Sequence, residues 1–243
     1  MPRRVWSARA TAVCISKGCA TEADKLYPGA VERKGKTIIS RWPIVIWSDS
    51  ALVIEPGQSL ELSTTDGAFL LNSGLLTVDH GELKASEGEN PGLKGFRPFV
   101  ATAMTGAFQA KGARFSRLGY ADAGSTSGLS ILGAALFPSK IGSHIVDSSF
   151  DNVSGVNLEN IHRVTVAGNR FSGGTGPAVA MKGVTGADIS DNVITGTTET
   201  QAIDIQNTSS SIRVAGNILL GNRGSGIFIA NDARDVTVTG NLM

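Results

Sequence analysis

Apolar and polar residues alternate in short runs along most of the chain, and Gly, Asn, Ser and Asp separate the runs. The alternation is clear after residue 50, and almost none of it has the spacing of an amphipathic helix. A two-residue period bounded by turn residues predicts short β-strands that bury one face. We therefore expect an all-β domain over residues 51–243, preceded by an irregular capping segment at residues 1–50.

One sequence frame recurs in the C-terminal half: VTVAGNRF at 164–171, ADISDNVI at 187–194, IRVAGNIL at 212–219 and VTVTGNLM at 236–243. Its asparagines are Asn169, Asn192, Asn217 and Asn241, spaced by 23, 25 and 24 residues. A repeat of this length with short strands and two turns predicts a solenoid. The leucine-rich pattern Leu-x-x-Leu-x-Leu is missing, so we expect a right-handed parallel β-helix with coils of about 21–25 residues.

Stacked coils would place equivalent residues in columns about 4.8 Å apart. An amide side chain both donates and accepts, so the four asparagines predict a buried hydrogen-bonded ladder. A second strand in each coil aligns as GVNLEN, PAVAMK, AIDIQN and GIFIAN, starting at residues 155, 177, 202 and 226.

This alignment assigns the side chains of the second strand to two faces. The expected inward columns are Val156, Ala178, Ile203 and Ile227, and Leu158, Ala180, Ile205 and Ile229. The expected outward columns are Asn157, Val179, Asp204 and Phe228, and Glu159, Met181, Gln206 and Ala230. A strand-end column would hold Asn160, Lys182, Asn207 and Asn231.

Composition and charge exclude several functional classes. With 22 Lys and Arg against 21 Asp and Glu, the net charge of +1 offers no basic face for a nucleic-acid partner. No apolar run approaches the roughly 18 residues of a membrane span. Cys14 and Cys19 are too few for a zinc site, although they could pair in a short-loop disulfide, so we expect no metal and no cofactor. No signal peptide is legible at the N-terminus.

Several segments upstream of the repeats resemble a known family. GAFLLNSG at 67–74, GFRPF at 95–99, LGY at 118–120, SGLSI at 127–131 and IVDSSFDN at 145–152 follow in the order seen in periplasmic mannuronan C5-epimerases. The resemblance covers residue 51 to the end. It implies a right-handed β-helix, an alginate-like uronate polysaccharide as partner, and a periplasmic or secreted location.

Epimerisation of a uronate needs a cation that neutralises the carboxylate, a base that removes the C5 proton, and an acid that returns a proton from the other side. By resemblance, the family's Asp-Pro-His-Asp stretch falls on residues 179–182, which read Val-Ala-Met-Lys. A family arginine falls on Asn207, and a histidine falls on Gln201. The catalytic motif is therefore degenerate, and we expect weak or no epimerase activity.

Charged residues nevertheless gather on the expected outer face. Lys182 is the candidate cation, and Asp204 or Glu159 is the candidate proton-transfer group, unless the three form only a solvated surface. The candidate substrate-binding residues are Arg97, Asn160, Gln206, Asn207, Phe228 and Asn231. Arg97 has a second interpretation as the anchor of a loop.

Three functions remain open at this point. The first is a uronate-polysaccharide-modifying protein related to the epimerases. The second is a non-catalytic polysaccharide-binding or structural β-helix, and the third is a lyase or glycoside hydrolase on the same scaffold.

The chain stops inside a coil, two residues after Asn241. An uncovered terminal coil exposes its core and its strand edge to other chains. We expect the β-helix to be truncated there, or to self-associate through that coil.

Overall fold

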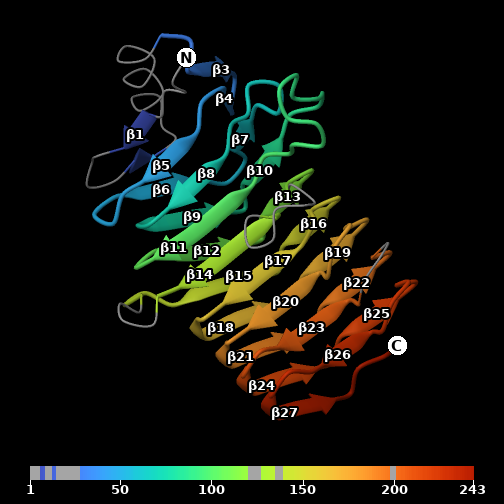
Figure 1. Cartoon of the computed structure of the whole chain (residues 1–243). Coiled ribbons are helices and arrows are strands. Elements are labelled where there is room, and N and C mark those ends of the chain that lie inside the picture. The colour runs from blue at the N-terminus through green and yellow to red at the C-terminus, as the bar shows by residue number, and fades with distance from the viewer. Residues whose placement is uncertain (1–5, 9–12, 15–27, 120–126, 135–138, 198–200) are drawn as a thin grey trace.

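The computed structural model describes residues 6–8, 13–14, 28–119, 127–134, 139–197 and 201–243. Cys19, and with it the pairing with Cys14, lies outside these residues. Every regular element in the described part is a β-strand, and the strands form three long sheets that run along one elongated stack (Figure 1).

Each sheet contains nine strands. The first sheet consists of β1 (Trp6–Ala8), β5 (Ile44–Ile46), β8 (Leu70–Asn72), β11 (Val100–Met104), β14 (Leu129–Gly133), β17 (Val156–Glu159), β20 (Val179–Lys182), β23 (Ile203–Gln206) and β26 (Ile227–Ile229). The second sheet consists of β2 (Val13–Cys14), β6 (Ala51–Ile54), β9 (Leu75–Asp79), β12 (Ala107–Lys111), β15 (Ser143–Val146), β18 (His162–Ala167), β21 (Thr185–Ser190), β24 (Ser210–Ala215) and β27 (Arg234–Thr239). The third sheet consists of β3 (Val31–Lys34), β4 (Thr37–Ser40), β7 (Ser59–Leu62), β10 (Glu82–Ala85), β13 (Arg114–Ser116), β16 (Ser149–Asp151), β19 (Arg170–Ser172), β22 (Val193–Thr195) and β25 (Ile218–Leu220).

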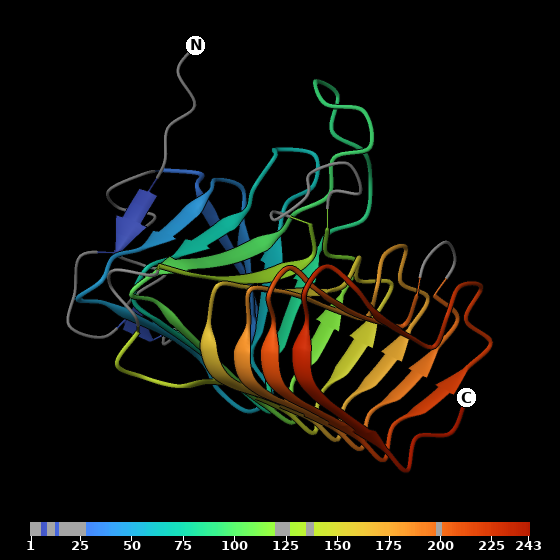
Figure 2. The same ribbon diagram turned by 60° about the horizontal axis from the view of Figure 1, so that its bottom comes forward.

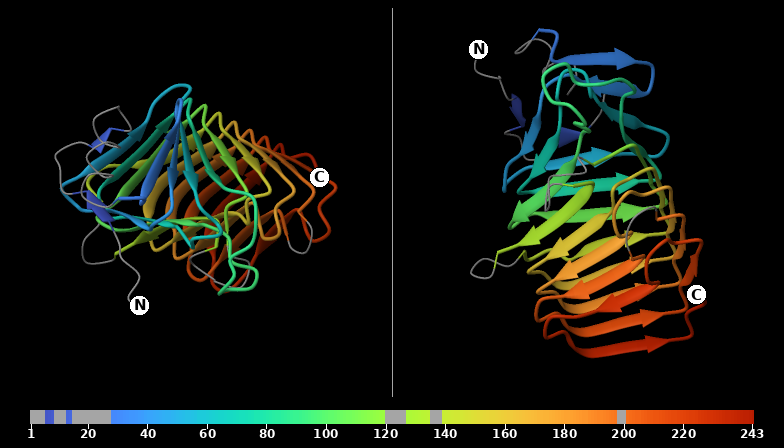
Figure 3. Two further views of the ribbon diagram at one scale, coloured as in Figure 1. Left: turned by 90° about the horizontal axis from the view of Figure 1, so that it is seen from above. Right: turned by 45° about the vertical axis from the view of Figure 1, so that its right-hand side comes forward.

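The chain visits the first, second and third sheets in turn and then begins the next coil, as β17, β18, β19 and β20 illustrate. Among the described strands, every pair is parallel except β3 with β4. The oblique view of Figure 2 and the view from above in Figure 3 show the sheets enclosing a common interior. The all-β parallel solenoid expected from the repeats is confirmed.

Most strands whose side chains the structure describes contribute one face to the interior. Alternate residues are buried, as in β9, where Leu76 and Val78 are both 0% exposed. Phe115, Phe150 and Phe171 stack from coil to coil inside the third sheet, with ring centroids 4.8 Å and 4.5 Å apart. A one-strand rise therefore brings equivalent side chains into direct contact.

The asparagine ladder runs through the turn that follows the second sheet. Asn169 Nδ2 donates to Asn192 Oδ1 at 3.0 Å, and Asn192 Nδ2 donates to Asn217 Oδ1 at 2.9 Å. Asn217 Nδ2 donates in turn to Asn241 Oδ1 at 2.9 Å. Asn169 Oδ1 accepts the backbone N–H of Ser148 at 2.9 Å, so the ladder extends one coil further.

The residue just before the ladder position adopts left-handed backbone angles in every one of these coils. In four successive coils it is Asp147, Gly168, Asp191 and Gly216, with φ of 52°, 67°, 56° and 66°. A Cβ on Gly168 would lie 2.5 Å from Asp147 Oδ1, and a Cβ on Gly216 would lie 2.5 Å from Asp191 Oδ1. Each aspartate carboxylate therefore occupies the space that a side chain on the next coil would need, and glycine, which also adopts these backbone angles freely, leaves it in place.

The parallel sheets reach further toward the N-terminus than the boundary expected at residue 51. Strands β4 and β5 precede that boundary and pair in parallel with β7 and β8. Ile44 and Ile46 on β5 are 1% and 0% exposed and belong to the common core. Part of the segment expected to be irregular thus contributes strands to the solenoid.

In the last coil the core columns end on partly exposed side chains. Ile229 and Val238 are 43% and 42% exposed, whereas their column neighbours Ile205 and Val214 are both fully buried. Self-association through this coil stays a prediction.

Candidate functional site

The register of the first sheet corrects one coil of the sequence alignment. Val179 pairs with Val156 and Met181 pairs with Leu158, and both Val179 and Met181 are 0% exposed. The prediction that Val179 and Met181 face outward and that Ala180 faces the core is therefore wrong. A shift of one residue transfers every side chain of a strand to the other face, and residues 178–181, Ala-Val-Ala-Met, are apolar throughout and carry no alternation that fixes the face. The inward columns are Val156, Val179, Ile203 and Ile227, and Leu158, Met181, Ile205 and Ile229, without Ala178 or Ala180.

The same correction moves Lys182 from the strand end to the outer face of the first sheet. Lys182 pairs with Glu159 on β17 and with Gln206 on β23, so these three residues form one column. The Lys182 side chain is exposed, and no ion pair involves it within the part of the chain that the structure describes. Gly183 takes the strand-end position that the sequence alignment gave to Lys182.

Asp204 lies on the same face, two residues before Gln206. It is only 8% exposed, and both of its carboxylate oxygens accept hydrogen bonds from Gln206 Nε2, each at 2.8 Å. Gln206 Oε1 accepts a hydrogen bond from Asn231 Nδ2 at 3.1 Å. These hydrogen bonds hold the amide of Gln206 and the carboxylate of Asp204 in one orientation. Phe228, the neighbour of Asp204 on β26, is 40% exposed beside them.

Asn160, Asn207 and Asn231 follow the strands of the first sheet at the strand-end position. Their φ angles are 52°, 53° and 53°, and asparagine is one of the few residues with a side chain that adopts such angles readily. The turn therefore explains why asparagine occurs at these positions. A role in substrate binding stays a prediction for Asn160 and Asn207.

Arg97 lies apart from this group, at the corner between the third and first sheets. Its Nε donates to the Arg117 carbonyl at 3.1 Å, and its terminal nitrogens donate to Asn152 Oδ1 at 3.2 Å and to the Asn152 carbonyl. Burial lowers the pKa of Arg97, and the charge of Arg117 lowers it further. Arg97 thus anchors a turn, which favours the second of the two interpretations, and we leave it out of the site.

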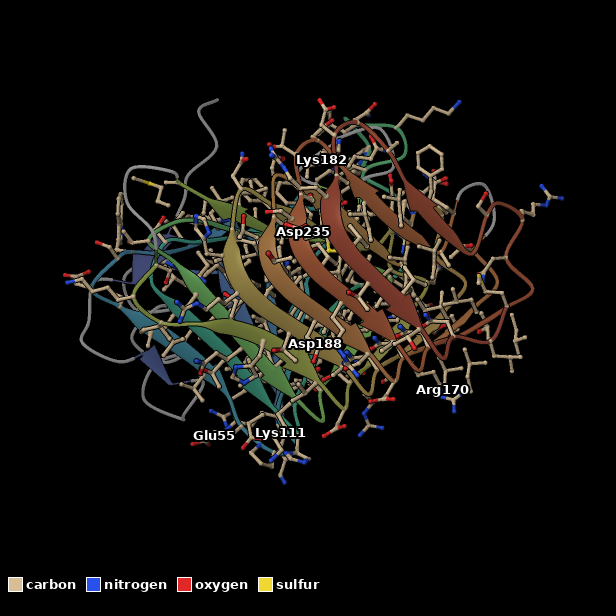
Figure 4. All side chains as sticks on the ribbon, turned by 90° about the horizontal axis from the view of Figure 1, so that it is seen from below. Glu55, Lys111, Arg170, Lys182, Asp188 and Asp235 are labelled. Carbon is tan, nitrogen blue, oxygen red and sulfur yellow. The ribbon has the colours of Figure 1, made fainter. Side chains whose placement is uncertain are left out.

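The outer face of the first sheet changes character along the stack. Toward the N-terminal end it presents Val45 and Leu71, beside the stacked rings of Phe69 and Phe99, whose centroids are 5.0 Å apart. Toward the C-terminal end it presents the site residues Glu159, Lys182, Asp204, Gln206 and Phe228. Figure 4 shows Lys182 on the opposite side of the molecule from Lys111 and Arg170.

Two kinds of site are not found in the described residues. They contain no group of three or more His, Cys, Asp or Glu side chains placed to hold a metal ion. They also contain no helix long and apolar enough to cross a membrane.

The geometry of three parallel sheets and a ladder agrees with comparisons to known proteins. The family model for the right-handed beta helix region matches residues 124–243. The chain is a right-handed parallel β-helix. No curated protein sequence matches this β-helix significantly.

Solved structures give the same fold for nearly the whole β-helix. A mutant of the periplasmic alginate epimerase AlgG superposes with a TM-score of 0.79 at 20% identity, covering 97% of this chain and 57% of that one. A second AlgG structure gives 0.73 at 19% identity, covering 97% of this chain and 62% of that one. The β-helix thus spans about three fifths of the length of these proteins, and the likeness establishes the fold.

Proposed function

We propose that the β-helix binds a uronate-containing polysaccharide across the outer face of the first sheet, over β17, β20, β23 and β26. The observation that carries this proposal is the corrected register, which puts a cation in one column with Glu159 and Gln206. Lys182 supplies the positive charge that a uronate carboxylate requires. Gln206, oriented by Asn231, offers polar atoms to sugar hydroxyls, and Phe228 offers an exposed ring face.

The shape of the surface supports a polymer as the ligand. Neighbouring strands repeat every ~4.8 Å, so the outward side chains of β17, β20, β23 and β26 form a row along which an extended chain can lie. The fold similarity to the periplasmic alginate epimerase AlgG favours a uronate polymer and a periplasmic or secreted location for this protein too.

We expect binding with little or no epimerisation. The positions that the family fills with its catalytic stretch hold Val179 and Met181, and both side chains are buried in the core. Glu159, Lys182 and Asp204 all rise from one sheet face, whereas inversion at C5 needs proton removal and proton return on opposite sides of the sugar ring.

A second candidate function is proton abstraction by a lyase-type mechanism. The observation that favours it is Asp204, a carboxylate that is 8% exposed and held in one orientation by Gln206. A lyase needs a base beside a neutralised carboxylate, and Asp204 and Lys182 lie diagonally on adjacent strands.

Two measurements test the proposal. In affinity electrophoresis through a gel that contains polymannuronate, the wild type should be retarded and Lys182→Gln should lose most of this retardation. Arg170→Gln is the matched control, because Arg170 is an exposed cation on β19 of the third sheet. Equal retardation of the two variants, or no retardation of the wild type, would contradict binding at this face. Proton NMR of the anomeric region after incubation with polymannuronate separates untouched, epimerised and cleaved polymer, and we expect the untouched spectrum.

A further inference from the structure

At the corner between the first and second sheets, one coil carries an insertion that the neighbouring coils lack. Between the first and second sheets, residues 160–161 separate β17 from β18 and residues 183–184 separate β20 from β21, but residues 134–142 separate β14 from β15. Insertions in individual repeats of a solenoid form loops on one face, and that face is often the binding face. The inserted segment therefore makes this corner a candidate binding site.

A pocket of about 390 Å³ opens at this corner. It is bounded by the ends of β11 and β14, by residues 139–142 of the insertion, by the start of β15, and by the turn from β17 to β18. Its volume lies within the range of roughly 300–1,000 Å³ of small-molecule sites.

Three basic side chains line the pocket: Lys140 from the insertion, and His162 and Arg163 from the turn of a later coil. All three are exposed, and in the described part of the chain none of them has a side-chain hydrogen bond or an ion pair. Of the described residues that line the pocket, none is Asp or Glu. The positive charge is therefore not neutralised locally, as it is for Arg213, whose Nη1 lies 2.8 Å from Asp188 Oδ1 on the second sheet.

The remaining walls combine apolar and amide groups. Met104 and Ile141 are 63% and 46% exposed, although apolar side chains of this size are usually covered. Asn160 lines the same pocket. A ligand that fits these walls carries a negative charge at one end, hydroxyl groups, and C–H surface for Met104 and Ile141 to contact.

We infer that this pocket binds a small sugar acid, with its carboxylate between Lys140 and Arg163 and its ring against Met104 and Ile141. Arginine suits a carboxylate because its planar guanidinium donates two parallel hydrogen bonds. His162 and Asn160 are placed to contact ring hydroxyls. The pocket is a second site, separate from the column of Glu159, Lys182 and Gln206, and it does not depend on polymer binding there.

Equilibrium dialysis with radiolabelled D-glucuronate, at neutral pH and low salt, tests this inference. D-glucose is the neutral ligand of similar size. The variants are Lys140→Gln and Arg163→Gly, and the second is compatible with the fold because the equivalent residue one coil later is Gly186, also with positive φ. Arg170→Gln serves as the charge-matched control, and thermal melting shows that each variant is folded.

We expect glucuronate to bind and glucose not to bind, and each pocket variant to weaken glucuronate binding about tenfold or more, as the loss of a charge-assisted hydrogen bond does. Arg170→Gln should bind as the wild type does. The inference is overturned if the wild type fails to prefer glucuronate over glucose, or if both folded pocket variants bind glucuronate normally.

The same carboxylate can belong to a free sugar acid or to the end residue of a polymer. Competition distinguishes these sources: displacement of labelled glucuronate by polymannuronate assigns a polymer end, and no displacement assigns a free sugar acid. The retardation assay on Lys182→Gln is read separately, so the failure of one proposal does not decide the other.

Discussion

Replacing Asn192 by Leu tests how far the buried ladder stabilises the stack. Asn192 is 0% exposed, and its Oδ1 accepts both the backbone N–H and the Nδ2–H of Asn169, each at 3.0 Å. Its Nδ2 donates to the Val166 carbonyl at 2.8 Å and to Asn217 Oδ1 at 2.9 Å. Leucine has a similar volume and can make none of these bonds.

The expected loss of stability follows from the buried polar groups that no longer have Asn192 as a hydrogen-bond partner. The backbone N–H of Asn169, one Nδ2–H of Asn169 and the carbonyl of Val166 lose this partner at a position where Asn169 and Asn192 are 1% and 0% exposed. A buried polar group left unsatisfied costs about 1–3 kcal/mol. Three such groups are affected, and burial of the leucine side chain offsets part of their summed cost. We therefore expect the free energy of unfolding to fall by about 3–5 kcal/mol.

Asn241→Leu is the matched control, because Asn241 accepts the same two bonds from Asn217, both at 2.9 Å, but is only half-buried. Water can replace a partner there, so we expect a loss of about 1 kcal/mol. Urea unfolding followed by circular dichroism measures both variants, and coincident transitions by tryptophan fluorescence check cooperativity. The reasoning fails if Asn192→Leu costs no more than Asn241→Leu.

Two further variants address the turns and the pH dependence. Gly168→Ala should destabilise more than Gly196→Ala in the same urea assay. Both glycines have a φ of 67°, but only at Gly168 would the new Cβ meet Asp147 Oδ1. Asp147→Ala should therefore remove the difference between the two variants. Burial alone would raise the pKa of Glu82. Hydrogen bonds from the Lys84 ammonium and the Ser59 hydroxyl, together with the charges of Lys84 and Arg114, outweigh burial, so the pKa of Glu82 is lowered. A lowered pKa contributes stability above the unfolded pKa and loses it as the pH falls through the folded pKa. Glu82→Gln should therefore destabilise at neutral pH and match the wild type in acid, and a pH-independent difference would exclude this account.

The sequence predicted the fold and the ladder because both depend on a repeated frame. The Gly-Asn step recurs at Asn169, Asn217 and Asn241, so a single sequence contains several aligned copies of the same turn. Alternation around this step then assigns the faces of the second sheet, in which Val164 and Val166 are buried.

The candidate site could be predicted only in part, because the strands of the first sheet contain no recurring step, like Gly-Asn, that fixes their alignment. Strand β20 is apolar on both faces apart from Lys182, so its register depends on pairing with β17 and β23, which a local pattern does not contain. The role of Arg97 depends on contacts with residues 117 and 152, which lie distant in sequence. The pocket did leave a signal in the sequence: the interval between SGLSILG and SHIVDSSF is longer than the corresponding interval in later coils.

At the position before the ladder, aspartate and glycine alternate from one coil to the next: Asp147, Gly168, Asp191 and Gly216. Every second coil is therefore equivalent there, and adjacent coils are not. Because each aspartate carboxylate fills the space beside the glycine of the coil that follows it, the unit that can be copied in this stretch without moving that carboxylate is a pair of coils rather than one. Removing one coil would set Asp147 against Asp191 at neighbouring levels, whereas removing two would restore an aspartate followed by a glycine. Lengthening or shortening of this β-helix, by evolution or by design, should therefore proceed most easily in steps of two coils.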